Sequence, residues 1–131
     1  MVKFLKFVFH VSVLSLIILS LFPGSLVGWL FYGDLSREAD LVKNPFGTSI
    51  NHFIFYVYIS LLGFSLYMRS KNFKKLVYSL FLLSIILELL QFVVPFRTFQ
   101  LYDLLGNFLG VLLSYFLVSI YLHLNKSWTN L

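Results

Sequence analysis

Four apolar stretches constrain this chain more than any other feature of its sequence. They run from about residue 7 to 22, 52 to 68, 76 to 94 and 104 to 122. A helix needs about 20 residues to cross the hydrocarbon core of a bilayer, with a range of about 17–25. The last three stretches fall within that range and the first lies just below it. The sequence therefore predicts several transmembrane helices.

Composition indicates the same class of protein. Of the 131 residues, 60% are hydrophobic and 11% are charged, whereas soluble domains average about 45–50% and about 25%. We therefore expect an all-α, polytopic membrane protein whose single domain, residues 1–131, is a bundle of four transmembrane helices. The chain has no cysteine, which excludes disulfides, cysteine-based zinc sites and thiol nucleophiles.

The first stretch has two interpretations. Its basic start, its apolar run and the small residues Ser25 and Gly28 after it also fit a cleavable secretory signal. However, the apolar sequence resumes in LVGWLFYG, and no Ala-x-Ala-like cleavage site is present. We expect a retained first span, with the cleaved signal as the alternative.

The basic residues lie in the connections between the stretches and predict the topology. If the N-terminus is cytoplasmic, seven of them face the cytoplasm and three face outward. The first group is Lys3, Lys6, Arg69, Lys71, Lys74, Lys75 and Lys126, and the second is Arg37, Lys43 and Arg97. The positive-inside rule then places both termini in the cytoplasm. The rule also accounts for the net charge of +5, so we expect no nucleic-acid partner.

Polar and small residues run along one side of each of the last three stretches, at steps of three or four. They are His52, Tyr56, Ser60, Gly63 and Tyr67; Ser84, Glu88, Gln91 and Pro95; and Asp103, Asn107, Gly110 and Ser114. A carboxylate that faces lipid costs at least about 2.5–3.5 kcal/mol. We therefore expect Glu88 to face the interior of the bundle, with Arg97, His52, Gln91 and Asn107 as available partners.

These residues also form a specific motif. Glu-x2-Gln-x3-Pro-x-Arg is followed by Asp after five residues and then by Asn and Gly. The matching positions are Glu88, Gln91, Pro95, Arg97, Asp103, Asn107 and Gly110, and a His-Phe-x-x-Tyr run begins at His52. The pattern resembles that of the VanZ-like family of small bacterial membrane proteins and covers about residues 49–121. Relatives commonly have Asp-Lys where this chain has Thr48 and Ser49, and often Gly where it has Phe96.

The resemblance implies a multi-pass protein of the bacterial inner membrane. The family name comes from an association with tolerance of glycopeptide antibiotics, which act on cell-wall precursors outside the membrane. The resemblance implies no particular chemistry. With both termini inside, the second and fourth stretches begin, and the third ends, on the outer side, so His52, Glu88 and Asp103 are predicted at the outer face. The function of these outer-face residues has to be argued from the residues themselves.

Three functions fit those residues. In the first, His52, Glu88, Gln91, Arg97, Asp103 and Asn107 line a pocket that binds membrane lipid or a lipid-linked envelope precursor, with Arg97 pairing a phosphate or carboxylate. In the second, Glu88 is the general acid or base of a hydrolase or transferase acting on a lipid phosphate. In the third, the bundle assists another membrane protein. We favour binding because no nucleophile is evident.

Several smaller expectations complete the interpretation. We expect no metal and no cofactor, because His52, Glu88 and Asp103 lack a metal-ligand spacing such as His-x3-His. Gly63, Gly106 and Gly110 are expected at close helix contacts, since small residues three or four apart permit them. Asp103 fits both helix capping and a site role. Oligomerisation, with itself or with another protein, stays open.

Overall fold

The computed structural model describes residues 1–37 and 49–129, and within these ranges the elements are all helices. They are α1 (Val2–Leu21), α2 (Leu26–Tyr32), α3 (Ser49–Tyr67), α4 (Phe73–Leu90) and α5 (Leu101–Thr129). The all-α prediction is therefore confirmed for the described residues. Lys43, which entered the topology prediction, lies outside them, as does the side chain of Lys126.

Three helices in the described part of the chain are long and apolar enough to cross a membrane. The spans are Val2–Leu21, Ser49–Tyr67 and Leu101–Asn125, which makes this a multi-pass membrane protein. In contrast, α4 carries Lys74, Lys75 and Glu88 within its 18 residues. At 1.5 Å per residue it is about 27 Å long, slightly less than the hydrocarbon thickness of about 30 Å. The fourth predicted span thus rests on a helix of suitable length but higher charge.

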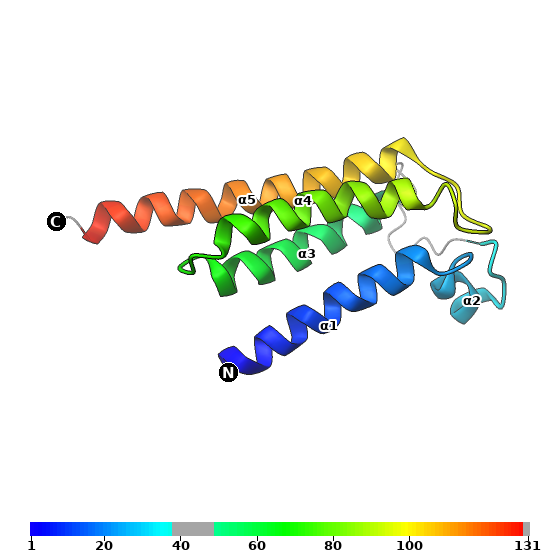
Figure 1. Cartoon of the computed structure of the whole chain (residues 1–131), viewed down its shortest axis with the longest axis horizontal. Helices are drawn as coiled ribbons and strands as arrows, with labels where there is room; N and C mark the ends of the chain where they lie inside the picture. The colour runs from blue at the N-terminus through cyan, green and yellow to red at the C-terminus, as the bar shows by residue number, and fades with distance from the viewer. Residues whose placement is uncertain (38–48, 130–131) are drawn as a thin grey trace.

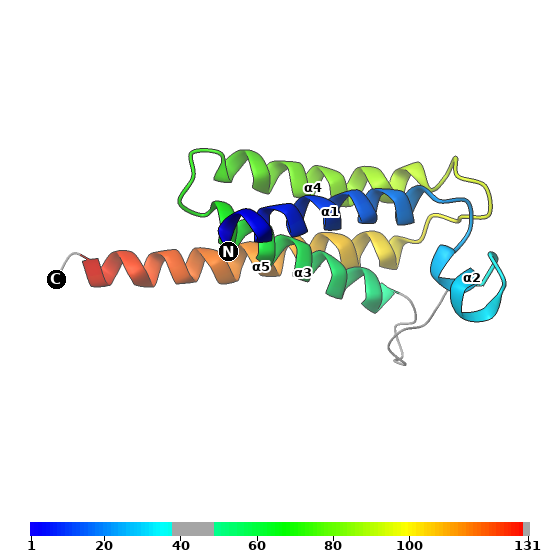
Figure 2. The ribbon, with the colours of Figure 1, turned by 90° about the horizontal axis from the view of Figure 1, so that it is seen from below.

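The four long helices lie side by side and alternate in direction (Figures 1 and 2). The N-terminus, the C-terminal end of α5 and the connection between α3 and α4 lie at one end of the bundle, on the left of Figure 1. The short helix α2 and the connection between α4 and α5 lie at the other end. α3 packs most extensively against α5, and α1 packs against α3 and α4.

The contact between α3 and α5 is close because glycines of α5 lie against the backbone of α3. A Cβ atom on Gly106 would lie 2.8 Å from the Ser49 carbonyl oxygen, and one on Gly110 would lie 2.7 Å from that of Phe53. A third glycine, Gly63 of α3, faces α1, where its Cβ would lie 2.6 Å from the Phe9 ring. The approach of α5 to α3 brings the first turns of these two helices together.

α4 ends earlier than the predicted stretch, at Leu90 instead of Val94. Beyond Leu90 the chain continues in tighter turns, with Phe92 N–H donating to the Leu89 carbonyl at 3.2 Å and Val93 N–H to the Leu90 carbonyl at 3.0 Å. Pro95 has no N–H to continue the helix and disfavours helical backbone at the residue before it. Phe96 follows with a φ of 58°, so the chain reverses through a left-handed residue.

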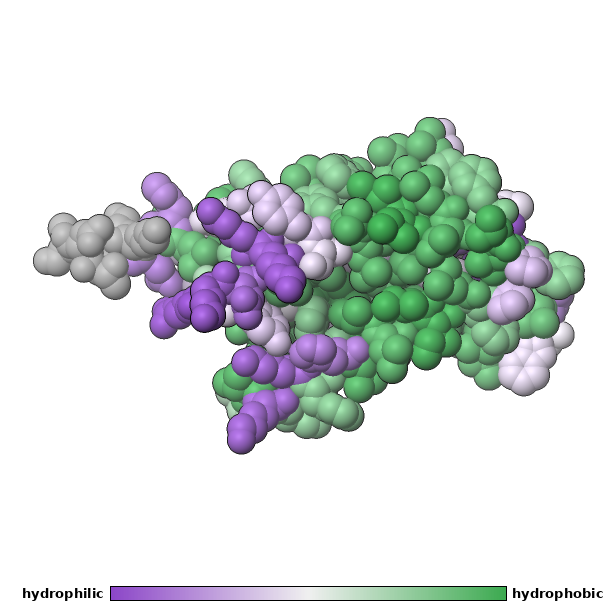
Figure 3. Space-filling model, in the orientation of Figure 1, coloured by the Kyte–Doolittle hydropathy of each residue, from purple (hydrophilic) through white to green (hydrophobic). Residues whose placement is uncertain are grey.

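The exterior of the bundle is apolar. Large hydrophobic side chains are exposed on every long helix, among them Leu14, Ile54, Tyr78 and Phe116. Figure 3 shows hydrophobic residues over the middle of the molecule and hydrophilic residues gathered at the end that holds the N-terminus. Exposed apolar area of this extent is expected of a surface that contacts lipid rather than water.

Candidate functional site

The polar residues of the motif form a row of contacts between α3, α4 and α5. The Ser49 hydroxyl donates to Asp103 Oδ1, and Asp103 Oδ2 lies 3.5 Å from His52 Nε2. The other ring nitrogen, His52 Nδ1, lies 3.2 Å from Asn107 Oδ1. The Asn107 amide nitrogen donates to Glu88 Oε2 at 3.3 Å. These five residues are called the buried polar cluster below.

The members of the buried polar cluster differ in their access to the surface. Glu88 is 1% exposed, Asp103 1% and Asn107 2%, whereas the side chain of His52 is 23% exposed. His52 and Ser49 are therefore the partly exposed members of the cluster, and Glu88, Asp103 and Asn107 are its buried members. Because both carboxylates are inside a membrane domain, they depend on these hydrogen bonds and on the imidazole for compensation.

Glu88 also holds the connection between α4 and α5. Its second carboxyl oxygen, Oε1, accepts the backbone N–H of Gln100 at 3.3 Å, just before α5 begins at Leu101. Gln91, one turn after Glu88, is 3% exposed, and its backbone N–H donates to the Glu88 carbonyl at 3.2 Å. Thus Gln91 lies beside the cluster, at the point where α4 ends.

Arg97 makes its described contacts with α1. Its Nη2 donates to the Leu19 carbonyl at 2.8 Å, and its Nε lies 3.5 Å from the Phe22 carbonyl, at the limit for a hydrogen bond. In the described part of the chain, no ion pair joins Arg97 to Glu88; the ion pair there is His52–Asp103. A cation at the C-terminal end of a helix is favourable, since it satisfies terminal carbonyls and opposes the dipole. The guanidinium thus ties the α4–α5 connection to the end of α1.

A further contact joins the same two segments. The Gly24 N–H donates to the Pro95 carbonyl at 3.1 Å, and Gly24 has a φ of 76°. A Cβ there would lie 2.5 Å from the Leu35 carbonyl oxygen, so glycine is needed at this position for both reasons. The segment after α1 therefore lies against the connection that carries Arg97.

Two buried hydroxyls on α3 have no hydrogen-bond partner among the described residues. They belong to Tyr56, which is 1% exposed, and Ser60, which is 0% exposed. They lie one and two turns after His52 along α3. Both residues belong to the polar side predicted for the second apolar stretch. A buried hydroxyl without a partner costs about 1–3 kcal/mol, so the polar side of α3 beyond His52 carries two groups that the described protein leaves unsatisfied.

Ser49 was also missed from the sequence, although a signal for it existed. Relatives commonly have a charged residue at this position, three residues before the histidine. In this chain the Ser49 hydroxyl donates a hydrogen bond to Asp103. Asp103 lies in the first turn of α5, where a negative charge opposes the helix dipole. Its contacts to Ser49 and His52 therefore coexist with a favourable position at the helix end.

The described side chains offer no group of three or more His, Cys, Asp or Glu residues arranged to hold a metal ion. What the cluster offers is hydrogen bonding. Both ring nitrogens of His52 face oxygens, those of Asp103 and Asn107. The amide orientation of Asn107 follows from its contact with Glu88, since a carboxylate accepts from the amide nitrogen.

The comparisons with known proteins identify one family. The family model described as VanZ/LLP1 matches residues 7–122, which include α1 from its second turn and most of α5. No curated protein and no solved structure matches the chain significantly.

Proposed function

The chain belongs to the VanZ/LLP1 family, as the motif indicated, and from its site we propose that it is a bacterial inner-membrane protein that binds an amphiphile. The observation that supports this proposal best is the row of contacts from Ser49 through Asp103, His52 and Asn107 to Glu88. Ionisable groups inside a membrane domain are costly and mark binding sites or ion pathways by default. Here a partly exposed imidazole lies in the middle of the row, between two buried carboxyl groups.

The chemistry of the cluster favours a ligand rich in hydrogen-bond donors. The His52 ring faces the Asp103 carboxyl and the Asn107 amide, and Asn107 in turn contacts the Glu88 carboxyl. The described hydrogen bonds of Arg97 go to carbonyls of the α1 end. Hydroxyl, amide or ammonium groups of a lipid-linked envelope precursor suit such a site, with the lipid tail beside the apolar helices. His52, Glu88, Asp103 and Asn107 are the proposed ligand residues. Arg97 and Gln91 position the connection that covers them.

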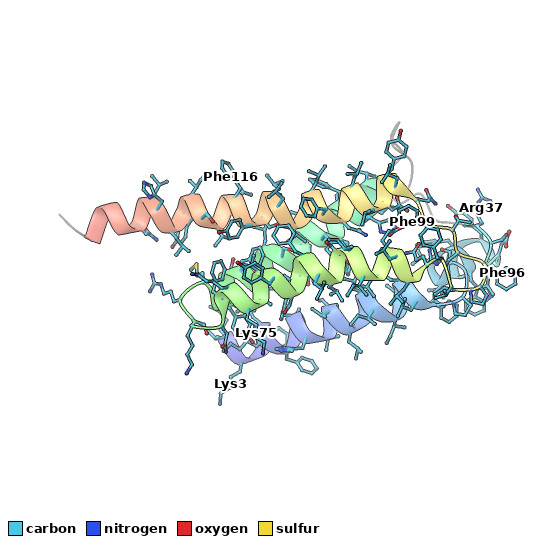
Figure 4. The ribbon with its side chains drawn as sticks, turned by 45° about the horizontal axis from the view of Figure 1, so that its top comes forward. Lys3, Arg37, Lys75, Phe96, Phe99 and Phe116 are labelled. Atoms are coloured by element: carbon cyan, nitrogen blue, oxygen red, sulfur yellow. The ribbon has the colours of Figure 1, made fainter. Side chains whose placement is uncertain are left out.

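The proposed topology has both termini in the cytoplasm and the buried polar cluster at the outer face, with α4 as the fourth span. It is supported by the basic residues at the end that holds the N-terminus, where Lys3 and Lys75 lie (Figure 4). The contacts of Arg97 with α1 support a retained first helix, since a cleaved α1 would leave this guanidinium without the Leu19 carbonyl.

The absence of cysteine allows a direct test of this topology. Single Lys71→Cys and Asp34→Cys variants, both at exposed positions, are treated in intact cells with a membrane-impermeant maleimide. We expect labelling of Asp34→Cys only, and labelling of Lys71→Cys after the cells are opened. Labelling of Lys71→Cys in intact cells would place the N-terminal end outside and the cluster at the inner face.

Ligand binding is tested by lipid retention. The purified full chain is incubated with a total bacterial lipid extract, and the retained lipids are identified by mass spectrometry. We expect His52→Gln to lose a lipid that the native chain retains, because glutamine has no ring whose two nitrogens can face the Asp103 carboxyl and the Asn107 amide at once. His10→Gln is the matched control, since His10 is exposed on α1 and its described contacts, with the Lys6 carbonyl and the Phe9 ring, lie within its own helix. Identical lipids in all three proteins would refute binding at the cluster.

The same variants test the role in the cell envelope. We propose that cells lacking the protein become more sensitive to glycopeptide antibiotics and that His10→Gln, but not His52→Gln, restores tolerance. The abundance of each variant in the membrane is measured in parallel. If His52→Gln disappears from the membrane, the cluster serves assembly, and the alternative of a structural bundle that assists another protein is supported instead.

A second candidate is an enzyme that acts on a lipid phosphate. The pair of His52 and Asp103, 3.5 Å apart, favours it because a carboxylate behind a histidine is a common acid–base arrangement. In this arrangement His52, not the deeper Glu88, would exchange protons with substrate. However, both ring nitrogens already face protein oxygens, so one contact must break before a proton is transferred. Phosphate release from a lipid diphosphate by the native chain, abolished in His52→Gln, would favour the enzyme over the binder.

A further inference from the structure

The end of the molecule opposite the buried polar cluster is strongly basic. Lys3, Lys6, Arg69, Lys71, Lys74 and Lys75 lie in α1, in the α3–α4 connection and in the first turn of α4. In the described part of the chain no Asp or Glu lies at this end, since Asp34, Glu88 and Asp103 belong to the other. The positive charge here is therefore not neutralised within the described protein.

A pocket of about 600 Å³ opens at this end, between the end of α3, the start of α4 and the C-terminal half of α5, and Arg69 is the one of these six basic residues that lines it. Its polar lining includes Arg69, Ser119 and His123, and its apolar lining includes Met68, Phe73 and Leu122. The buried Phe64 ring contacts the Phe73 ring edge-on, with centroids 5.7 Å apart. The pocket thus has hydrogen-bond donors on one side and an apolar wall on the other. Its volume lies within the usual range for ligand sites, about 300–1,000 Å³.

The pocket also lies at the depth of a membrane surface. Leu122 follows Leu101, the first residue of α5, by 21 residues, or about 32 Å along a helix. The hydrocarbon core is about 30 Å thick. A site that borders Leu122 is therefore one hydrocarbon thickness from the start of α5, at the level of lipid headgroups, whichever face of the membrane it occupies.

We propose that this pocket binds the phosphate headgroup of an anionic phospholipid. The Arg69 guanidinium supplies paired N–H donors to the phosphate oxygens, and the Ser119 hydroxyl and the His123 ring supply further donors. The acyl chains follow Met68, Phe73 and Leu122 into the lipid. Basic pockets at helix ends are suited to anionic headgroups because the phosphate supplies the negative charge that no described acidic side chain supplies at this end. This site is separate from the buried polar cluster and does not depend on its function.

The test uses the full chain, purified in dodecyl maltoside and titrated with phosphatidylglycerol or with phosphatidylcholine of the same acyl chains. Native mass spectrometry measures the fraction of protein that carries lipid. We expect tighter binding of phosphatidylglycerol, and at least about a tenfold loss of its affinity in Arg69→Gln, the loss that one charge-assisted hydrogen bond implies. Ser119→Leu, which fills the pocket without changing the charge, should lose binding too.

Lys3→Gln is the matched control because it removes one positive charge at the same end, outside the pocket lining. It should bind phosphatidylglycerol like the native chain. An equal loss in Lys3→Gln and Arg69→Gln would show a diffuse charge effect and overturn the site, as would unchanged binding by Ser119→Leu. Glycerol 3-phosphate is added as a soluble competitor. If it binds as tightly as the lipid, the site takes a free phosphate ester and the lipid assignment is wrong.

Discussion

The charged side chains at the two ends of this bundle differ in their burial. At one end, Glu88 and Asp103 are almost completely buried and held by side chains from α3 and α5. At the other, Arg69, Lys71 and Lys75 are exposed on a short connection and the first turn of α4. The positive-inside rule explains the basic end, where the charged side chains remain solvated and cost little folding free energy. The buried end costs free energy that a purely structural bundle would avoid, which is why we assign it a function.

The largest expected effect tests whether the buried cluster is an interdependent network. Asn107→Leu removes the amide between His52 and Glu88, leaving a buried carboxyl and a ring nitrogen without their partner. We expect the free energy of unfolding in detergent to fall by about 3–5 kcal/mol, because two hydrogen bonds are lost and each buried group left unpaired costs about 1–3 kcal/mol, with more for a charged group. Denaturation with sodium dodecyl sulfate measures it.

The basic end offers the matched substitution. Asn72 is exposed before α4, and its side chain makes no capping hydrogen bond, so Asn72→Leu should change the free energy by about 0.5 kcal/mol or less. Equal effects of Asn107→Leu and Asn72→Leu would remove the contrast between the two ends.

The next effect concerns how the α4–α5 connection is attached to α1. Arg97→Lys keeps the charge but loses the planar fork that reaches the Leu19 and Phe22 carbonyls. A loss of about 1.5–3 kcal/mol is expected, the range for a hydrogen bond from a charged group. Hydrogen exchange should become faster at the end of α1. Arg69→Lys, at the basic end, should leave exchange in α1 unchanged, and faster exchange there in both variants would contradict this role.

A smaller effect is expected at the turn before Arg97. Phe96 is 79% exposed and has a φ of 58°, a conformation that costs a non-glycine residue about 1–2 kcal/mol. Phe96→Gly should therefore raise the free energy of unfolding by about 1 kcal/mol, measured by thermal unfolding in detergent. Phe99→Gly should lower it, because the Phe99 ring stacks on Phe92 with centroids 4.7 Å apart. Destabilisation by both changes would mean that Phe96 is needed as an aromatic anchor at the interface.

Periodicity and hydropathy predicted the parts of the fold that depend on single helices. The apolar stretches became α1, α3, α4 and α5 because a buried backbone in lipid must satisfy its own hydrogen bonds. The left-handed backbone at Phe96 was not predicted, although the glycine that relatives often have at this position is a signal for it. The early end of α4 was also missed. The apolar run continues to Val94, whereas Pro95 disfavours helical backbone before that residue, and the helix ends at Leu90.

The partners of the polar residues were harder to predict than their burial. Glu88 was expected to meet a polar group inside the bundle, and spacing put His52 and Asn107 within reach. The contacts of Arg97 with α1 depend on how the first helix docks, which no spacing within residues 88–110 encodes. The opposite charges of Glu88 and Arg97 in one motif suggested that they pair. However, the unsatisfied carbonyls at the end of α1 also accept hydrogen bonds from a guanidinium, and the sequence does not show which helix end lies near Arg97.

The smallest effect concerns an acidic residue that the bundle leaves in water. Hydrogen bonds from the Ser36 hydroxyl and backbone N–H, at 2.7 and 2.9 Å, lower the pKa of Asp34 below its ordinary value. A depressed folded-state pKa contributes stability above the ordinary pKa of the unfolded chain, and this is lost as the pH falls through the folded value. Because Asp34 is fully exposed, the change in stability should be below detection. Carbonyl chemical shifts should still show a lowered titration midpoint that Ser36→Ala restores toward the ordinary value. An unchanged midpoint would mean that the Ser36 contacts do not persist in solution.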